Sequence, residues 1–311
     1  MKRNILLSIL ILVSVFCTIT LYNYHNENTS VIEIARSDSR SSFIESKLGI
    51  TRYKVFGNQN NQTVILIHSF NGFLESWDHN VPALVRAGYK VVTYDLFGRG
   101  LSDRPKVDYD LALFRNQLDL IVKKSGSGNL HLIGSSFGSV IAADFANKNP
   151  ELVNSLIMLG PAGWPDKKNQ NKLLNIPIVS DLAFHYFGTQ ILKPKVKAYF
   201  IDPSEHHNMV NTWSRFASYP GFTRSALSTL QNSPVLDYTS GYKALSKLDI
   251  PTLFIWGKQD VSFPFSNTKK LSKLMPKAQV IGIYNAAHWV NIEQANKVNK
   301  AIIEFLSVNK H

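Results

Sequence analysis

Short apolar runs alternate with longer amphipathic stretches along most of the chain, and this alternation predicts a mainly parallel sheet covered by helices. Segments such as 114–125 and 140–150 carry apolar residues at three- and four-residue spacing, which is typical of helices that pack on a sheet. Residues 42–46 and 52–58 predict two antiparallel strands at the leading edge. Six further runs, rich in β-branched and aromatic residues, indicate strands at 63–70, 90–98, 130–138, 154–162, 251–260 and 278–288.

The interval from residue 166 to residue 237 breaks this alternation. It lacks a strong strand pattern but holds many aromatic and apolar residues at helical spacing. We therefore expect a helical cap here, inserted into a core that residues 41–165 and 238–311 form together. Ordinary packing accounts for most of the cap's aromatic side chains, and some of them are expected to line an apolar pocket between the cap and the sheet.

The first 22 residues form a membrane-directed segment in this interpretation. Lys2 and Arg3 precede the run 5–22, which contains neither a charged residue nor a proline. A helix of that length spans roughly 27 Å, close to the thickness of the hydrocarbon core of a bilayer. We favour a retained anchor over a cleaved signal peptide, because the small residues that suit cleavage are missing after the run. The basic residues then place the bulk of the chain outside the cytoplasm.

Cleavage of the segment would instead give a secreted or periplasmic protein. In either case, residues 23–40 are polar enough to form a linker, although residues 31–34 carry apolar side chains that could pack on the body.

Composition excludes several classes of function. The net charge of +12 comes from 34 Lys and Arg against 22 Asp and Glu, without the basic run or motif of nucleic-acid binding. An anionic membrane surface suits this charge better. Cys17, the one cysteine, lies in the apolar N-terminal run, and the histidines lack the spacing of a zinc site. We expect no metal and no cofactor, and the oligomeric state stays open.

The strongest chemical signal lies at residues 134–138, which are Gly-Ser-Ser-Phe-Gly between a predicted strand and a predicted helix. A Gly-x-Ser-x-Gly sequence in this context forms a tight turn that projects the central hydroxyl, while the glycines let neighbouring backbone close in. Only Ser136 has a glycine two residues away on both sides. It is the candidate nucleophile, whereas Ser135 is a neighbour at the turn and Ser139 belongs to the first turn of the helix.

A serine nucleophile needs a base that takes its proton and an acid that orients the base. Asp260 and His288 follow the last two predicted strands, in the chain order Ser, Asp, His that accompanies this type of turn. His68 and Asp95 also follow strands, but their positions favour a role in shaping loops. We expect Ser136, Asp260 and His288 to form a catalytic triad.

The attacked carbonyl oxygen becomes negative and needs backbone N–H donors. Phe137 is expected to supply one donor, because it begins the helix after the nucleophile, where free N–H groups and the helix dipole favour negative charge. Phe70, in the loop after the strand 63–70, is expected to supply the second.

These segments together resemble the α/β-hydrolase superfamily, in its capped branch. The resemblance covers nearly all of residues 50–308 and is carried by residues 68–77, 94–105, 134–138, 159–165, 255–260 and 286–306. It implies an α/β-hydrolase fold, with a mostly parallel eight-stranded sheet flanked by helices and a helical cap inserted after strand 6. Dehalogenase and epoxide hydrolase relatives carry an aspartate where this chain has Ser136. One departure is Ser69, where the family usually has glycine.

The resemblance implies a cofactor-free serine hydrolase that cleaves carboxylic esters through an acyl-enzyme. The aromatic cap and the anchor suggest apolar or lipid-like substrates, such as a monoacylglycerol, and a membrane partner. The side chains expected to line the substrate pocket are Trp164, Trp213, Arg215 and Trp289.

Two alternatives remain open at this stage. One is a C–C bond hydrolase that acts on vinylogous diketones, because residues 159–163 and the pair His288-Trp289 also resemble that group, with Arg215 or Arg224 as a substrate contact. The other is a noncatalytic binding protein on the same fold.

Overall fold

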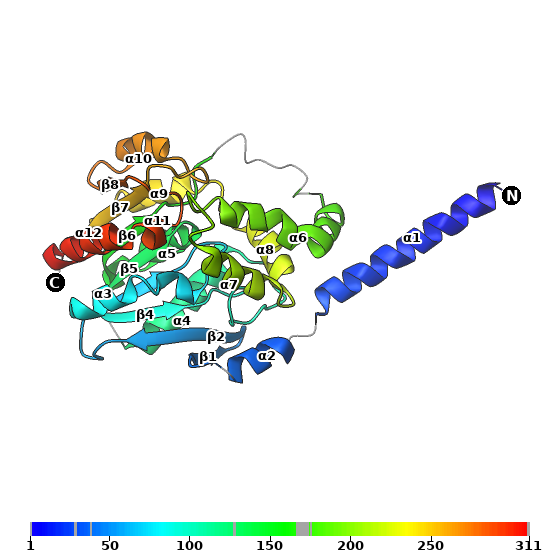
Figure 1. Ribbon diagram of the computed structural model, residues 1–311, viewed down its shortest axis with the longest axis horizontal. Coiled ribbons are helices and arrows are strands. Elements are labelled where there is room, and N and C mark those ends of the chain that lie inside the picture. Colours follow the sequence, from blue (N-terminus) through cyan, green and yellow to red (C-terminus); the bar gives the residue numbers. More distant parts are fainter. Residues whose placement is uncertain are drawn as a thin grey trace.

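A central sheet organises the computed structural model, which describes residues 2–27, 30–37, 39–126, 129–165, 174 and 176–309. The sheet has eight strands in the order β1-β2-β4-β3-β5-β6-β7-β8 (Figure 1). β2 pairs antiparallel with β1 and β4, and all other pairings are parallel. This confirms the predicted sheet. Its strands are β1 (Ser42–Ser46), β2 (Gly49–Phe56), β3 (Thr63–Ile67), β4 (Lys90–Tyr94), β5 (Leu130–Ser135), β6 (Val153–Leu159), β7 (Thr252–Gly257) and β8 (Gln279–Ile283).

The six parallel strands end earlier than the sequence pattern predicts, each by three to five residues at its C-terminal end. The apolar pattern continues because the loops that follow are themselves buried. Phe70 after β3 and Phe97 after β4, for example, are 6% and 1% exposed. These loops lie at the carboxyl edge of the sheet, where function collects in folds of this kind.

Helices cover both faces of the sheet, and each face has its own hydrophobic core. One core includes side chains of α3 and α12, and the other includes side chains of α4, α5, α9 and α10. The helices are α3 (Val81–Arg86), α4 (Leu111–Ser125), α5 (Phe137–Lys148), α9 (Thr239–Leu245), α10 (Thr268–Leu274), α11 (Val290–Glu293) and α12 (Ala295–Val308), with short 3₁₀ turns η1 (Leu74–Trp77), η2 (Pro150–Leu152) and η5 (Phe265–Asn267).

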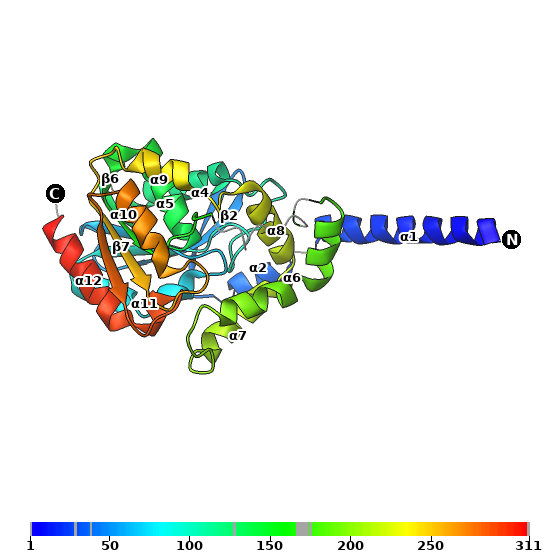
Figure 2. The same cartoon turned by 90° about the horizontal axis from the view of Figure 1, so that it is seen from above.

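The predicted helical cap follows β6. It comprises α6 (Val179–Lys197), α7 (His207–Ala217) and α8 (Phe222–Asn232). Figures 1 and 2 place the three helices together at one end of the sheet, between the sheet and the N-terminal helix. Part of the predicted cap, residues 166–173 and 175, lies outside the described residues.

The N-terminal helix α1 (Lys2–His25) projects away from the body (Figure 1). Among the described residues it is the one helix that is long and apolar enough to cross a membrane. Its last turns pack on α6, where the hydroxyls of Thr20 and Tyr186 are 3.1 Å apart and the rings of Tyr24 and His185 meet edge to face at 5.1 Å.

The predicted linker 23–40 is in part a docked helix, α2 (Ser30–Ser37). Ile32 is 1% exposed, and the Arg36 guanidinium donates to the Leu101 carbonyl at 2.8 Å and to the Asp103 carboxylate at 2.5 Å. The apolar side chains within residues 31–34 were the signal for this packing, and of these Ile32 is the buried one. Residues 30–37 therefore pack on the folded body.

Candidate active site

Ser136 stands at a strained turn between β5 and α5. Its backbone has φ 52° and ψ −113°, a conformation that costs free energy in any residue with a side chain. The surrounding structure holds it there, because the Ser136 N–H donates to the Leu159 carbonyl at 2.8 Å and its carbonyl accepts from the Ala162 N–H at 3.2 Å. Strain of this kind persists where function uses it.

The two flanking glycines are required by close backbone contacts. A Cβ atom on Gly134 would lie 2.4 Å from the Gly138 carbonyl, and one on Gly138 would lie 2.2 Å from the Ile67 carbonyl oxygen. A side chain on Gly134 would force β5 and α5 apart within the turn, and one on Gly138 would push the turn away from β3. The two glycines therefore keep the turn tight and close to the strand that leads to the Phe70 loop.

The neighbouring serines have other surroundings. The Ser139 hydroxyl donates to the Gly134 carbonyl at 2.8 Å and ties the helix to the turn. The Ser135 hydroxyl is buried and has no hydrogen-bond partner among the described residues. Of the three serines, only Ser136 lines the cavity described below.

Asp260 and His288 form a buried pair at the ends of β7 and β8. His288 Nδ1 lies 2.7 Å from Asp260 Oδ2, and a carboxylate can only accept, so Nδ1 carries the proton and Nε2 is left free as a base. Asp260 is fixed in turn, because its Oδ1 accepts from the N–H groups of Ser262 at 2.8 Å and Phe263 at 2.9 Å. The structure thus brings together the two residues that the sequence pairs.

His68 and Asp95 shape the loops around the site. His68 Nε2 accepts from the Leu96 N–H at 2.9 Å, and its Nδ1 donates to the Ser69 carbonyl at 2.7 Å. Full burial lowers the pKa of His68 from 6.5 to about 3, which keeps the ring neutral. The Asp95 carboxylate accepts from two backbone N–H groups and pairs with Arg52 at 3.1 Å.

The loop that carries Phe70 is held from two sides. The Arg99 Nε–H donates to the Phe70 carbonyl at 2.6 Å, and the Arg99 guanidinium lies 4.7 Å from the centre of the Phe70 ring. On the other side, the Ser69 hydroxyl accepts from the indole N–H of Trp289 at 2.9 Å. Phe137 is the first residue of α5, where N–H groups lack partners within the helix. Phe70 lines the same cavity as Ser136, and Phe137 follows Ser136 directly in the chain, so their role as oxyanion donors stays a prediction.

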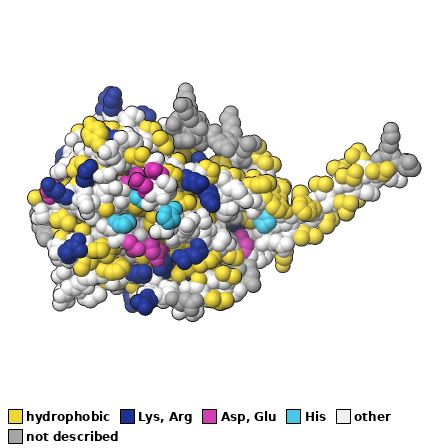
Figure 3. All heavy atoms as spheres, in the orientation of Figure 1, with side chains coloured by type: hydrophobic (Ala, Val, Ile, Leu, Met, Phe, Trp, Pro, Cys, Tyr) yellow, Lys and Arg dark blue, Asp and Glu magenta, His cyan; other side chains and the backbone are white. Residues whose placement is uncertain are grey.

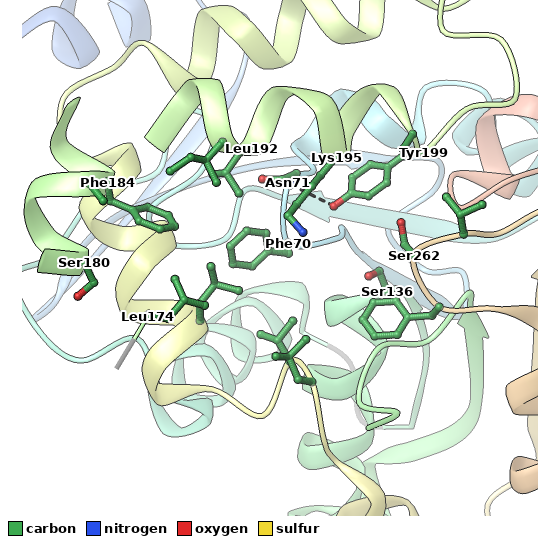
Figure 4. A pocket seen from close by; sticks show the side chains of 18 of the residues that line it. Phe70, Asn71, Ser136, Leu174, Ser180, Phe184, Leu192, Lys195, Tyr199 and Ser262 are labelled. Atoms are coloured by element: carbon green, nitrogen blue, oxygen red, sulfur yellow. Dashed lines mark hydrogen bonds between the residues drawn. The ribbon is translucent and has the colours of Figure 1, made fainter. Parts of the chain in front are cut away.

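A cavity of about 490 Å³ lies between the cap and the sheet, with Ser136 in its wall. Figure 4 shows Ser136 with Tyr199 and Ser262 at one side of the cavity, and Phe184 and Leu174 at the other. Its lining residues are Phe70, Asn71, Ser136, Leu174, Val179, Ser180, Ala183, Phe184, Ile191, Leu192, Lys195, Ala198, Tyr199, Leu230, Val235, Leu236, Val261, Ser262 and Phe263.

None of the four residues expected to line the pocket is among these, so that expectation needs correction. Trp164 stacks on Tyr242 and Trp213 packs edge to face on Phe222, both inside the core. Arg215 is exposed, and Trp289 holds Ser69.

Arg224, considered as a substrate contact for C–C bond hydrolysis, does not line the cavity either. It donates to the Arg104 carbonyl at 2.9 Å and pairs with the Glu27 carboxylate at 3.1 Å.

Sequence reasoning missed a cluster where the cap meets the site. The Asn71 amide donates to the Tyr199 hydroxyl at 3.0 Å, and the Tyr199 ring lies 4.8 Å from the His288 ring. The backbone N–H of Trp289 donates to the Tyr199 carbonyl at 3.0 Å. Tyr199 thereby joins the end of α6 to the Phe70 loop and to the histidine loop. Its place in an aromatic cap segment was a signal, but one that it shared with many neighbours.

The fold and this arrangement are those of an α/β hydrolase. The family model for the alpha/beta hydrolase fold matches residues 62–295, and the chain belongs to this family. Among the described residues, no group of three His, Cys, Asp or Glu side chains is placed to hold a metal ion.

Curated relatives include hydrolases named for hydroxy-oxo-dienoate compounds. One relative is a 2-hydroxy-6-oxononadienedioate/2-hydroxy-6-oxononatrienedioate hydrolase from Cupriavidus pinatubonensis. The two sequences are 28% identical over 284 residues, a stretch that covers 86% of this chain and 95% of that protein.

Among solved structures, an enol-lactonase from Burkholderia xenovorans LB400 matches with a TM-score of 0.74 at 17% identity, over 86% of this chain and all of that one. A membrane phospholipase A, described as a bacterial virulence factor, matches with a TM-score of 0.71 at 22% identity, over 99% of each chain. At these identities the likeness shows the fold alone.

Proposed function

We propose that this protein is a serine esterase that works at a membrane surface and cleaves carboxylic esters of apolar or lipid-like acids. One observation carries the proposal: the cavity at Ser136 is lined mostly by apolar side chains, several of them on α6, the cap helix against which α1 packs. Val179 and Ile191 line the cavity and are also 51% and 40% exposed. Part of the cavity lining therefore belongs to an exposed apolar surface.

That surface is continuous with the anchor helix. Figure 3 shows hydrophobic side chains along α1 and over the adjoining part of the cap. Soluble proteins rarely expose apolar patches of this kind without a partner. A bilayer into which α1 inserts would cover this patch as well. The exposed apolar residues on and just before α6 are Ile176, Ile178, Val179, Tyr186, Phe187 and Ile191.

In the first half of the proposed reaction, Ser136 Oγ attacks the ester carbonyl carbon while His288 Nε2 takes the hydroxyl proton. Asp260 holds the imidazole in the required tautomer and stabilises the imidazolium. The oxyanion accepts from the N–H groups of Phe70 and Phe137. Collapse of the tetrahedral intermediate breaks the ester C–O bond, and the imidazolium gives its proton to the departing alcohol.

In the second half, a water molecule attacks the acyl-enzyme while His288 takes its proton. Collapse returns that proton to Ser136 and releases the carboxylic acid. The apolar cavity holds the acyl chain through both halves. All groups in this scheme belong to the chain, so the proposal requires no cofactor.

The membrane phospholipase match supports the lipid-like substrate and the membrane setting. Because it covers 99% of this chain, it includes the N-terminal helix as well as the hydrolase fold. We also propose that α1 is retained as an anchor and that the basic residues at its N-terminal end keep the catalytic domain outside the cytoplasm. Digestion by a protease that has access to the outer face of the membrane that carries the protein, as in spheroplasts, would support this orientation, and full protection there would contradict it.

A second candidate function is C–C bond hydrolysis of ring-fission products. Four curated relatives at 23–28% identity are named as hydrolases of such dienoates. The same serine, histidine and backbone donors could serve attack on a ketone carbonyl. The exposed apolar surface beside α1 favours the lipid ester as substrate, because a water-soluble dienoate does not require an enzyme surface that faces a membrane.

One substrate panel separates the two functions. Full-length protein in phosphatidylcholine nanodiscs is offered nitrophenyl esters and monoacylglycerols of increasing chain length, and a vinylogous diketone. We expect turnover of the esters, with a preference for longer chains. Turnover of the diketone alone would favour C–C hydrolysis.

Matched serine variants test the nucleophile in the same panel. Ser136→Ala should abolish turnover and labelling by a fluorophosphonate probe, while Ser135→Ala should keep both, because its hydroxyl has no partner among the described residues. Labelling of Ser136→Ala at the wild-type rate would contradict the assignment.

A further inference from the structure

We propose that Lys195 forms a binding subsite for an anionic group of the substrate, so that this esterase prefers esters that carry a phosphodiester or a carboxylate. The inference rests on the proposed function and adds a substrate class to it. Lys195 lies on α6, the cap helix that runs along the cavity. Figure 4 shows its amino group directed into the cavity, on the side of Phe70.

Charge is scarce in this cavity. Among the lining residues, which all belong to the described part of the chain, Lys195 is the one with an ionised side chain at neutral pH. Most of the others are aliphatic or aromatic, and the polar ones are neutral amide or hydroxyl groups. Lys195 is also exposed to solvent, so it lies where the cavity meets the surface and is accessible to an incoming anion. A bound anion would find no other charged group among the lining residues to compete with this lysine.

Within the described residues, no carboxylate neutralises Lys195. The ion pairs of this part of the chain join other residues, and none places an acidic oxygen within 4.0 Å of the Lys195 amino group. The ammonium keeps three donors available for an incoming oxyanion. Lys193 and Lys197, two positions away on either side, do not line the cavity.

Most labelled polar groups of the cavity lie near the nucleophile, whereas Ser180 lies on the far side beside Phe184. Figure 4 places Asn71, Tyr199, Ser262 and Ser136 together on the side that Lys195 approaches, while Phe184 and Leu174 lie on the opposite side. This division suits a substrate with two ends. The acyl chain would occupy the apolar side, and the anionic group would lie under α6 within reach of Lys195.

The expected gain follows from the kind of bond. A hydrogen bond between a charged donor and an oxyanion contributes a net ~1.5–3 kcal/mol, which corresponds to a factor of about 10 to 100. We expect this factor in kcat/KM between anionic and neutral esters of matched chain length. Lys195 is a specificity residue in this account, so esters without the charge should not depend on it.

The test uses full-length protein in phosphatidylcholine nanodiscs and two matched substrate pairs. Ethyl hexanoate is compared with the hexanoyl ester of glycolic acid, which adds a carboxylate on the alcohol side of the ester. Monohexanoylglycerol is compared with hexanoyl-lysophosphatidylglycerol, which adds a phosphodiester. The pair in which wild type prefers the charged member identifies the source of the anion.

Three variants complete the design. Lys195→Met keeps the length of the side chain and removes the charge, and should lower kcat/KM by about 10- to 100-fold for the charged substrate alone. Lys195→Arg should retain most of the preference. Lys193→Met, the control on the same helix, should leave it unchanged. Equal losses for charged and neutral substrates, or a preference that survives Lys195→Met, would overturn the proposal.

A binding measurement separates this proposal from the proposed function. Hexyl phosphate is titrated calorimetrically into Ser136→Ala protein in nanodiscs, with hexanol as the neutral comparison. We expect saturable binding of hexyl phosphate that Lys195→Met weakens by at least 10-fold. Such binding without ester turnover in wild type would sustain the anion subsite and reject the esterase, whereas turnover without charge-dependent binding would reject the subsite alone.

Discussion

The hydrogen bond between Ser69 and Trp289 joins the two loops that meet at the nucleophile. The Ser69 hydroxyl accepts from the Trp289 indole N–H at 2.9 Å, and the two residues are 2% and 1% exposed. Ser69→Ala removes the acceptor and leaves the indole N–H buried without a partner, which costs ~1–3 kcal/mol of unfolding free energy. For a chain of this size, that corresponds to a fall in Tm of roughly 2–6 °C.

Activity should suffer along with stability. Ser69 precedes Phe70, and Trp289 follows His288, so the bond sets the distance between the oxyanion loop and the catalytic base. Because both groups act mainly in the transition state, we expect kcat to fall several-fold with little change in KM. Ser69→Gly, which restores the usual family residue, should lose stability at least as much as Ser69→Ala, because glycine also adds freedom to the unfolded chain.

A double-mutant cycle tests the reasoning. Tm and kcat are measured for Ser69→Ala, Trp289→Phe and the double variant, all as full-length protein in nanodiscs. Trp289→Phe keeps an aromatic ring against Phe73 and Tyr199 but removes the N–H donor. If the bond matters, the double variant should be less destabilised than the sum of the single variants. Strict additivity, or a Ser69→Ala protein as stable as wild type, would refute the argument.

Three further outcomes follow from the site and its supports. Asp260→Asn should lower kcat by about 10⁴-fold in ester hydrolysis, because the amide favours the wrong tautomer of the histidine, and a loss below tenfold would argue against the triad. The His68 ring stays neutral when folded, with a pKa of about 3, but is protonated below about pH 6.5 when unfolded. Urea unfolding should therefore show stability falling as the pH drops from 6.5 towards 3, by up to ~1.4 kcal/mol per unit from this ring, and His68→Gln should reduce that slope. Gly138→Ala would place a Cβ 2.2 Å from the Ile67 carbonyl oxygen and should lower Tm far more than Gly88→Ala, whose Cβ meets open space and carries only the strain of a φ of 87°; equal Tm values would contradict the close-contact argument.

The sheet and the nucleophile turn were predictable because both leave local signals in the sequence. Strands in this fold are short and apolar and are followed by loops with distinctive polar residues. The polar residues of the site can therefore be found at the ends of successive strands. The turn at Ser136 needs glycine at two fixed positions, where a Cβ would collide with backbone. Constraints of this kind act over a few residues and can be recognised without knowledge of the tertiary structure.

The cavity lining was not predictable in the same way. Trp164 and Trp213 have the size and polarity of pocket residues, yet both are buried in the core, because an aromatic side chain packs equally well in either place. Which face of a cap helix meets the cavity depends on how that helix lies over the sheet. Lys195 shows the same limit, because nothing in the sequence distinguishes it from the other lysines of α6 that do not face the cavity.

One ion pair joins the N-terminal segment to the cap, and another joins it to the core. Glu27 pairs with Arg224 of α8 at 3.1 Å, and Arg36 pairs with Asp103 at 2.5 Å. A shortened protein that begins near residue 40, the natural choice for a soluble preparation, would leave Arg224 with backbone carbonyls alone and would free the cap from this brace. Kinetic constants from such a protein would describe a hydrolase with a less firmly held cap, so removal of the N-terminal segment would alter the part of the molecule that covers the cavity.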